Sequence, residues 1–240
     1  TDESGQALLP TAVQRDLVDG VIVFGYSDDK YIQCLSRDKV YFVHLEEIDP
    51  SRDSVVVLTD HLHNISLLVE HLLELGHRRM GIAACLDMPW ETMAQHVLGF
   101  ELSMRKAGLE FKPAEQVFSF KFEELYVAGR RVAQQILNRA ERPTAIIFTE
   151  DTYAVQAIIT FQSEGLNVPR DISVVGCGNY QCGLGSRPTL TTIKKFPELS
   201  AQRAIEKLAE LIEKGPSEVP ERIYIPGRLI TRDSSGPSPS

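Results

Sequence analysis

The sequence predicts a doubly wound α/β protein, in which helices cover both faces of parallel sheets. Between residues 62 and 177, short apolar runs alternate with segments whose apolar residues recur at helical spacing. This order is typical of parallel strands joined by helical crossovers. The 240 residues are 43% hydrophobic and 24% charged, a balance that indicates a globular chain with room for one large or two small domains.

The predicted elements follow from apolar periodicity and from helix-capping residues. The first long helix has Asp60 as its N-cap and ends at Gly76. Strands are expected at 21–25, 40–45, 54–58, 80–85, 116–120, 145–149, 173–177 and 222–230, with a short extended piece at 191–193. Helices are expected at 62–75, 91–107, 123–138, 151–164 and 198–214. Residues 233–240, rich in Ser and Pro, are expected to be a disordered tail.

Composition excludes several classes of function. A formal net charge of −8 argues against DNA binding by this chain alone, because phosphates need a basic face. No apolar run is long enough to span a bilayer, and the first residues do not resemble a signal peptide. The four cysteines do not match zinc or redox spacings. Without a disulfide framework, the sequence favours the cytoplasm, and no glycine pattern predicts a nucleotide cofactor.

Ligands of doubly wound sheets bind beyond the carboxyl ends of the strands. Glu150 follows one such end and is read either as a helix cap or as an effector contact, whereas Asp151 is read as a cap. Trp90 is either an anchor for a ligand or partner or a satellite of the core. Phe122 is either strand core or a wall of the site. Phe24, at the end of the first strand, also belongs to the candidate site.

Histidines gather near the helix at 62–75, but adjacent His61 and His63 lack the i, i+4 spacing of helical metal ligands. We therefore expect no metal site. No nucleophile accompanies the acidic residues, so the sequence predicts no catalytic residues and a protein that is not an enzyme.

Six segments, in order, resemble the effector-binding domain of transcription regulators of the lactose/galactose-repressor type. They are VDGVI at 18–22, EHLLELGHRR at 70–79, GF at 99–100, PTAII at 143–147, VPRDISVVG at 168–176 and PTLTTI at 188–193. The resemblance implies a periplasmic-binding-protein-like fold, with two subdomains and the effector in the cleft between them. It places residues 1–60 and 188–216 in the first subdomain and 61–187 and 217–232 in the second. It also implies that the first subdomain lacks its opening strand-helix-strand, and that the helix-turn-helix is missing.

The pocket positions depart from the family pattern. Asp60 is retained, but His96 stands where the family usually has an Arg that holds a sugar hydroxyl. Glu150 replaces an Asn, and Asn179 ends a segment that usually carries two Asp residues. These changes favour a neutral polyol or a cationic or amine-bearing effector over an anion, which would meet like charge at Asp60 and Glu150.

The resemblance predicts the effector-sensing and dimerising domain of a bacterial transcription repressor, without its DNA-binding part. Its partners are a sugar or sugar-like effector, a second copy of the chain, and operator DNA through the helix-turn-helix only. Ligand-driven closure of the cleft would couple the effector to DNA binding. The alternative is a periplasmic solute-binding protein of the same fold.

Overall fold

In the computed structural model, the described residues are 9–25, 29–46, 54–86, 91–121, 124, 127–215 and 221–239. The chain divides into two compact units, and it crosses between them three times. The first unit contains Thr1–Thr59 and Phe196–Ile225, and the second contains Asp60–Lys195 and Pro226–Ser240. Within the described residues, no helix combines the length and apolar character needed to cross a membrane.

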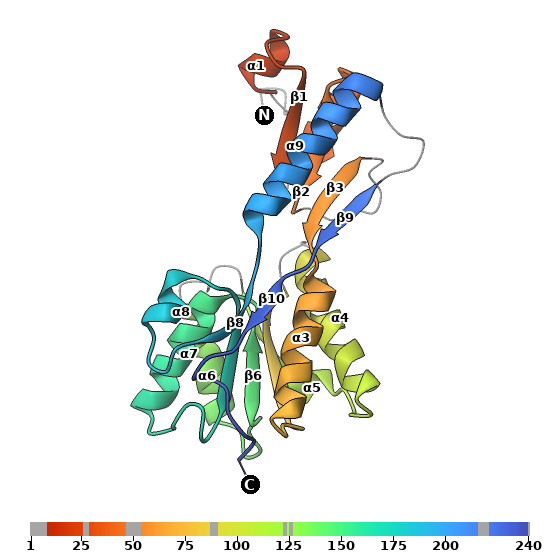
Figure 1. Cartoon of the computed structure of the whole chain (residues 1–240). Coiled ribbons are helices and arrows are strands. Elements are labelled where there is room, and N and C mark those ends of the chain that lie inside the picture. The colour runs from red at the N-terminus through yellow and green to blue at the C-terminus, as the bar shows by residue number, and fades with distance from the viewer. Residues whose placement is uncertain are drawn as a thin grey trace. The chain divides into compact units, whose positions relative to one another are not determined.

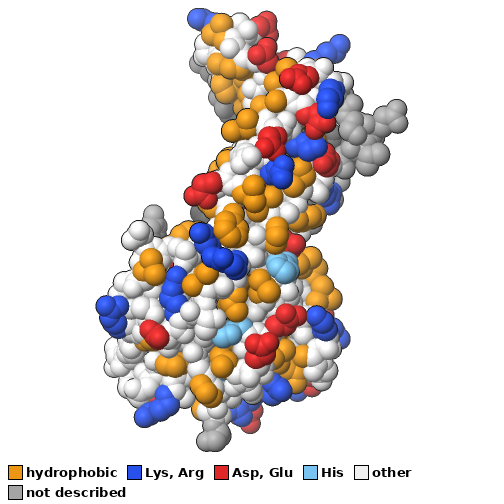
Figure 2. Space-filling view, viewed as in Figure 1, with side chains coloured by type: hydrophobic (Ala, Val, Ile, Leu, Met, Phe, Trp, Pro, Cys, Tyr) orange, Lys and Arg blue, Asp and Glu red, His pale blue; other side chains and the backbone are white. Residues whose placement is uncertain are grey.

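The first unit is built on a four-stranded parallel sheet with the order β1-β2-β3-β9. Its strands are β1 (Gly20–Phe24), β2 (Tyr41–Leu45), β3 (Val55–Thr59) and β9 (Arg222–Ile225). Its helices are α1 (Thr11–Gln14), α2 (Asp29–Arg37) and α9 (Pro197–Lys214). Helix α9 buries Ala204 against Val43 and Val57 of the sheet. Acidic and basic side chains alternate along the outer surface of α9 (Figure 2), where Arg203 pairs with Glu206 at 2.8 Å.

The second unit is built on a six-stranded sheet with the order β10-β8-β7-β6-β4-β5, in which only β10 is antiparallel to its neighbour (Figure 1). Its strands are β4 (Met80–Cys85), β5 (Val117–Phe120), β6 (Ala145–Phe148), β7 (Ser173–Gly178), β8 (Thr191–Lys194) and β10 (Arg228–Ile230). Its helices are α3 (His61–Glu74), α4 (Glu91–Lys106), α5 (Pro113–Gln116), α6 (Ala128–Leu137), α7 (Asp151–Ser163) and α8 (Gln181–Gly185).

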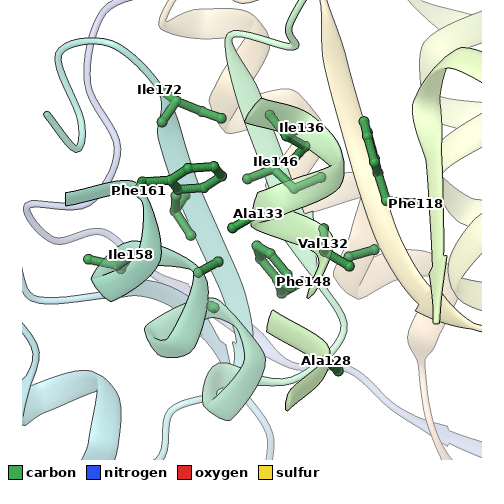
Figure 3. Close-up of a cluster of buried hydrophobic side chains, with 14 of the residues drawn as sticks. Phe118, Ala128, Val132, Ala133, Ile136, Ile146, Phe148, Ile158, Phe161 and Ile172 are labelled. Carbon is green, nitrogen blue, oxygen red and sulfur yellow. The ribbon is translucent and has the colours of Figure 1, made fainter. Parts of the chain in front are cut away.

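Two hydrophobic cores hold the helices to opposite faces of this sheet. On one face, Phe118 and Phe148 of the strands pack with Phe161 of α7 and Val132 of α6 (Figure 3). On the other face, α3 and α4 bury their apolar sides against β4, β6 and β7. Burying a side chain as large as Phe contributes on the order of 2 kcal/mol. Strands that are buried on both faces explain why the sequence shows them as continuous apolar runs.

The predicted strand at 222–230 is two strands that belong to different sheets. Strand β9 pairs with β3 in the first unit, and β10 pairs with β8 in the second. The break falls at Pro226 and Gly227, because proline cannot donate to a strand ladder. The backbone amide of Gly227 instead donates to Asn64 Oδ1 at 2.8 Å. The chain thus changes units between residues 225 and 226, within the segment that the sequence predicted to be one strand of one subdomain.

Residues 233–239, expected to form a disordered tail, have defined contacts in the second unit. Ser234 is fully buried, and its hydroxyl donates to the carbonyl of Val174 at 2.6 Å. The same hydroxyl accepts from the backbone amide of Thr191 at 2.9 Å. The small Ser side chains that suggested disorder are therefore the groups that bind this segment to β7 and β8.

Candidate functional site

The carboxyl ends of β4, β6, β7 and β8 lie along one edge of the second unit's sheet, and helices α3, α4 and α7 begin on the same side. Most of the polar residues at this edge follow a strand or open a helix, and His96 lies in the second turn of α4. We define the candidate site as the residues Asp60, His61, His96, Glu150, Asp151, Asn179 and Lys195, which all belong to the second unit.

The candidate site contains a partly buried ion pair. Lys195, directly after β8, places its Nζ atom 3.1 Å from Glu150 Oε1, directly before α7. Burial alone would lower the pKa of Lys195, but the carboxylate of Glu150 opposes this effect and the pKa lies above its ordinary value. Glu150 is the N-cap residue of α7 by position, but its side chain forms no hydrogen bond to the amides of the helix. Its reading as an effector contact stays a prediction.

Asp151 has a structural role that differs from the predicted helix cap. Its side chain is fully buried, and one oxygen accepts from Thr192 Oγ1 at 2.6 Å while the other accepts from the backbone amide of Tyr180 at 2.7 Å. Burial raises the pKa of Asp151, although both hydrogen bonds act in the opposite direction. The carboxylate thus connects the start of α7 with β8 and with the segment that follows β7.

Two buried histidines lie together: His61 is the first residue of α3, and His96 lies in the second turn of α4. The rings of His61 and His96 have their centroids 4.3 Å apart and are inclined at 53°. Burial lowers the pKa of His61 well below its ordinary value, and the nearby charges of His96 and Lys195 lower it further. His61 is therefore neutral at neutral pH and adds no charge to the candidate site.

Asp60 and Asn179 both make local hydrogen bonds. Asp60 is the N-cap of α3, as predicted, and its Oδ1 accepts from the backbone amide of His63 at 2.9 Å. Asn179 has a left-handed backbone with φ of 59°. Its Oδ1 accepts from Arg232 Nη2 at 2.5 Å, so the amide is engaged within the protein. The cap bond uses only one carboxylate oxygen of Asp60, and the other oxygen can accept from a ligand.

Two tyrosines add apolar surface and hydroxyl groups near the ion pair. Burial raises the pKa of Tyr153 to about 12, with a further contribution from the charge of Glu150. The pKa of Tyr180 is also raised to about 12, for the same two main reasons. Both phenols therefore stay protonated and can donate hydrogen bonds.

The remaining predicted site residues have different outcomes. Phe24 lies in the first unit at the end of β1, and its side chain is 73% exposed. Trp90 and Phe122 lie outside the described residues. The sequence missed Lys195, Tyr153, Tyr180 and the pairing of His61 with His96. A lysine directly after an apolar extended run was the available signal for Lys195.

Among the described residues, no group of three or more His, Cys, Asp or Glu side chains is arranged to hold a metal ion. The four cysteines, which all lie within the described residues, form no disulfide bond with one another, and Cys177 is fully buried. Burial raises the pKa of Cys177 to about 12, which makes it unreactive as a nucleophile.

Comparison with known proteins gives the affiliation of the chain. A family model described as "Periplasmic binding protein-like domain" matches residues 69–235. The HTH-type transcriptional repressor PurR of Haemophilus influenzae (strain PittEE) is 29% identical over 221 residues, covering 90% of this chain and 64% of that repressor. A LacI-family regulatory protein from Chloroflexus aggregans has a TM-score of 0.84 at 24% identity, covering 94% of this chain and 79% of that one. The lac repressor dimer, solved with operator and the anti-inducer ONPF, has a TM-score of 0.79 at 23% identity, covering 94% and 78%.

Together, the parallel-sheet units and these matches define an effector-binding domain of the lactose/galactose-repressor type. The chain belongs to the periplasmic binding protein-like domain family. The curated relative is a transcriptional repressor, which favours a regulator over the alternative of a periplasmic solute-binding protein. The chain covers 64% of the length of that relative.

Proposed function

We propose that this chain is the sensing part of a transcription repressor, and that a neutral, polyhydroxylated small molecule binds at the carboxyl edge of the second unit's sheet. The ion pair between Glu150 and Lys195 is the observation that carries this proposal. Its two opposite charges compensate each other at 3.1 Å, so the pair can hydrogen-bond a ligand without attracting a strongly charged one. The neutral His61 and the protonated tyrosines add no charge to the surroundings of the ion pair.

An anionic effector is disfavoured by the remaining charge of the candidate site. Asp60 caps α3 through one oxygen and places a carboxylate at the sheet edge. A bound anion would lie near Asp60 and Glu150 while Lys195 is already paired. A sugar or sugar-like polyol instead provides hydroxyl groups that donate to the carboxylates and accept from the lysine.

Calorimetry with a small panel tests the effector class. The panel contains neutral sugars, an amino sugar, a sugar phosphate and a dicarboxylate. We expect a neutral sugar to bind and the Glu150→Gln variant to weaken it at least about tenfold, the loss of one charge-assisted hydrogen bond. Glu164→Gln, which removes the same charge at the other end of α7, is the matched control and should bind normally. Tight binding of the sugar phosphate that is lost in His96→Ala but unchanged in Glu150→Gln contradicts the proposal.

We propose that the regulator is cytoplasmic, is not an enzyme and acts as a homodimer. Exposed apolar side chains on the neighbouring helices α7 and α8, among them Ile159 at 61% and Leu184 at 48% exposure, support a surface for a second copy. The lac repressor, whose fold this chain shares, is a dimer when bound to operator. Analytical ultracentrifugation of Ile159→Asp should show a monomer, whereas Leu102→Asp, an exposed leucine on α4, should leave the dimer intact.

We propose that operator DNA is bound by a part of the protein outside these 240 residues. The net charge of −8 gives the chain itself little attraction for phosphates. The effector regulates that part only if it binds one state of the regulator more tightly than the other. A mobility-shift experiment in which this chain alone binds a specific DNA sequence tightly would contradict the assignment.

A further inference from the structure

A second concave site lies at the opposite edge of the same sheet. A pocket of about 310 Å³ is formed where β4, β5 and β6 begin, between the loops that precede these strands and the end of α6. Strand β4 has six residues from Met80 to Cys85, which places the two edges about 17 Å apart at about 3.3 Å per residue. The pocket is therefore separate from the candidate effector site.

Four arginines contribute to the pocket lining: Arg78, Arg79, Arg139 and Arg142. Backbone carbonyl groups orient three of them. Arg78 Nη1 donates to the carbonyls of His77 at 2.9 Å and Leu73 at 3.2 Å, and Arg142 Nη2 donates to the carbonyl of Leu137 at 2.9 Å.

Arg139 is the most firmly held of these arginines. Its Nη2 atom donates to the carbonyl of Ala114 at 3.1 Å, and its Nη1 atom donates to the carbonyl of Glu115. The guanidinium carbon also lies 4.4 Å from the centroid of the Phe118 ring. These contacts fix the side chain without neutralising its charge.

The acidic residues of the pocket are concentrated around a lysine. Lys112 Nζ lies 3.2 Å from Glu110 Oε2. The hydrogen bond to Glu110 raises the pKa of Lys112, and the charges of Glu115 and Glu141 raise it further. Within the described part of the chain, none of the four arginines forms an ion pair with a carboxylate. Five cationic and three acidic side chains line the pocket, so it has an excess of two positive charges in a chain of net charge −8.

We propose that this pocket binds a small, multiply charged oxyanion, either free phosphate or the phosphate group of a small metabolite. Guanidinium groups present parallel N–H donors that match the oxygens of a phosphate. Because backbone carbonyls already orient three of the arginines, binding costs little side-chain entropy. The volume is at the lower end of the range of about 300–1,000 Å³ that is common for ligand pockets, which suits a ligand no larger than a sugar phosphate.

Calorimetry on the 240-residue chain, at constant ionic strength, tests this proposal with inorganic phosphate and with ribose 5-phosphate. We expect the double variant Arg79→Gln/Arg142→Gln to weaken binding of the anion at least about tenfold, because two charge-assisted contacts are lost. Arg130→Gln/Arg131→Gln is the matched control, since it removes two positive charges near the opposite end of α6. Stronger binding of ribose 5-phosphate than of phosphate identifies a metabolite as the ligand, and equal binding identifies the free ion.

Two results overturn the proposal. One is that neither anion binds more tightly than chloride, which would mean that the arginines act only in local structure. The other is that Lys195→Gln abolishes anion binding while Arg79→Gln/Arg142→Gln preserves it, which would place the anion at the opposite edge. Loss of effector binding in Glu150→Gln leaves the proposal about this pocket unaffected, so the two proposals fail independently.

Discussion

Replacement of His77 is expected to destabilise the second unit through one buried hydrogen-bonded cluster. The side chain is fully buried just before β4. Its Nδ1 atom lies 2.9 Å from Thr144 Oγ1, and its Nε2 atom lies 3.1 Å from Ser173 Oγ and 3.0 Å from the carbonyl oxygen of Gly236. One imidazole thus connects the starts of β4, β6 and β7 with the C-terminal segment.

The expected loss of stability depends on which hydrogen bonds each partner keeps after the imidazole is removed. Thr144 Oγ1 still donates to the carbonyl of Arg79 at 3.1 Å, and Ser173 Oγ still accepts from the amide of Gly236 at 3.0 Å. The free energy of unfolding therefore falls only by the contribution of the histidine's own hydrogen bonds, about 1 kcal/mol each. His77→Phe, which keeps most of the volume, should cost about 2–3 kcal/mol. His77→Ala adds a cavity and should cost about 3–5 kcal/mol.

The pH dependence has a defined sign. Burial lowers the pKa of His77 below the ordinary value of 6.5, so the unfolded chain binds the proton more readily. The contribution of the neutral imidazole is complete above pH 6.5 and is lost as the pH falls towards the folded-state pKa. His77→Phe should therefore flatten the acid side of the stability profile. It will not remove the slope entirely, because burial also lowers the pKa of His61.

Urea unfolding followed by circular dichroism at neutral and mildly acidic pH measures both effects. Hydrogen exchange in peptides from β4, β6 and β7 shows whether the loss is confined to the second unit. His63→Ala removes an exposed histidine of α3 and serves as the control. An unchanged urea midpoint for His77→Phe at neutral pH would refute the reasoning, because it would mean that these hydrogen bonds contribute no net stability.

Two further substitutions test local packing and capping. In Gly129→Ala, the new Cβ atom would overlap the carbonyl oxygen of Tyr153 and lie 2.7 Å from Gln156 Cβ, so thermal unfolding should reveal a loss of about 2–3 kcal/mol. Gly185→Ala has open space around the new methyl group and should change stability little. Asp60→Ala removes the N-cap of α3 and should cost about 1 kcal/mol in urea unfolding, whereas Asp60→Asn should recover most of it. Equal stability of the Ala and Asn variants would contradict a capping role.

The parallel-strand architecture of the second unit could be predicted because its periodicity is strong. In α3, Ile65, Leu68, Val69 and Leu72 recur at helical spacing and are all fully buried. Helix α2 was missed because its nine residues offer few apolar anchors, mainly Ile32 and Leu35. The division between β9 and β10 was also missed, although the Pro226-Gly227 dipeptide was an available turn signal.

The C-terminal segment could not be predicted from its composition. Ser and Pro are typical of disordered tails, and a local pattern does not show which buried groups a segment will meet. Ser234 and Gly236 are ordered by partners on β7, on β8 and at His77, which are distant in the chain. Hydrogen bonds of this kind depend on the tertiary arrangement, so the sequence predicted disorder where the fold provides partners.

The charge of the candidate site shows why site chemistry is harder to predict than fold. The chain has His96 where the family pattern has an Arg, and Glu150 where it has an Asn. These two differences indicated an acidic pocket. The strand order β8-β7-β6 brings Lys195 to Glu150 from 45 residues away. This pairing compensates the charge of Glu150 but not that of Asp60, since an ion pair acts on a distant ligand as a dipole and not as a charge. The ion pair therefore supports the proposed preference for a neutral effector over a cationic one. The proposed role of the ion pair predicts that Lys195→Gln, which leaves Glu150 unpaired, will increase the affinity for an amino sugar relative to the corresponding neutral sugar. An unchanged ratio of the two affinities in calorimetry would show that the ion pair does not contact the effector.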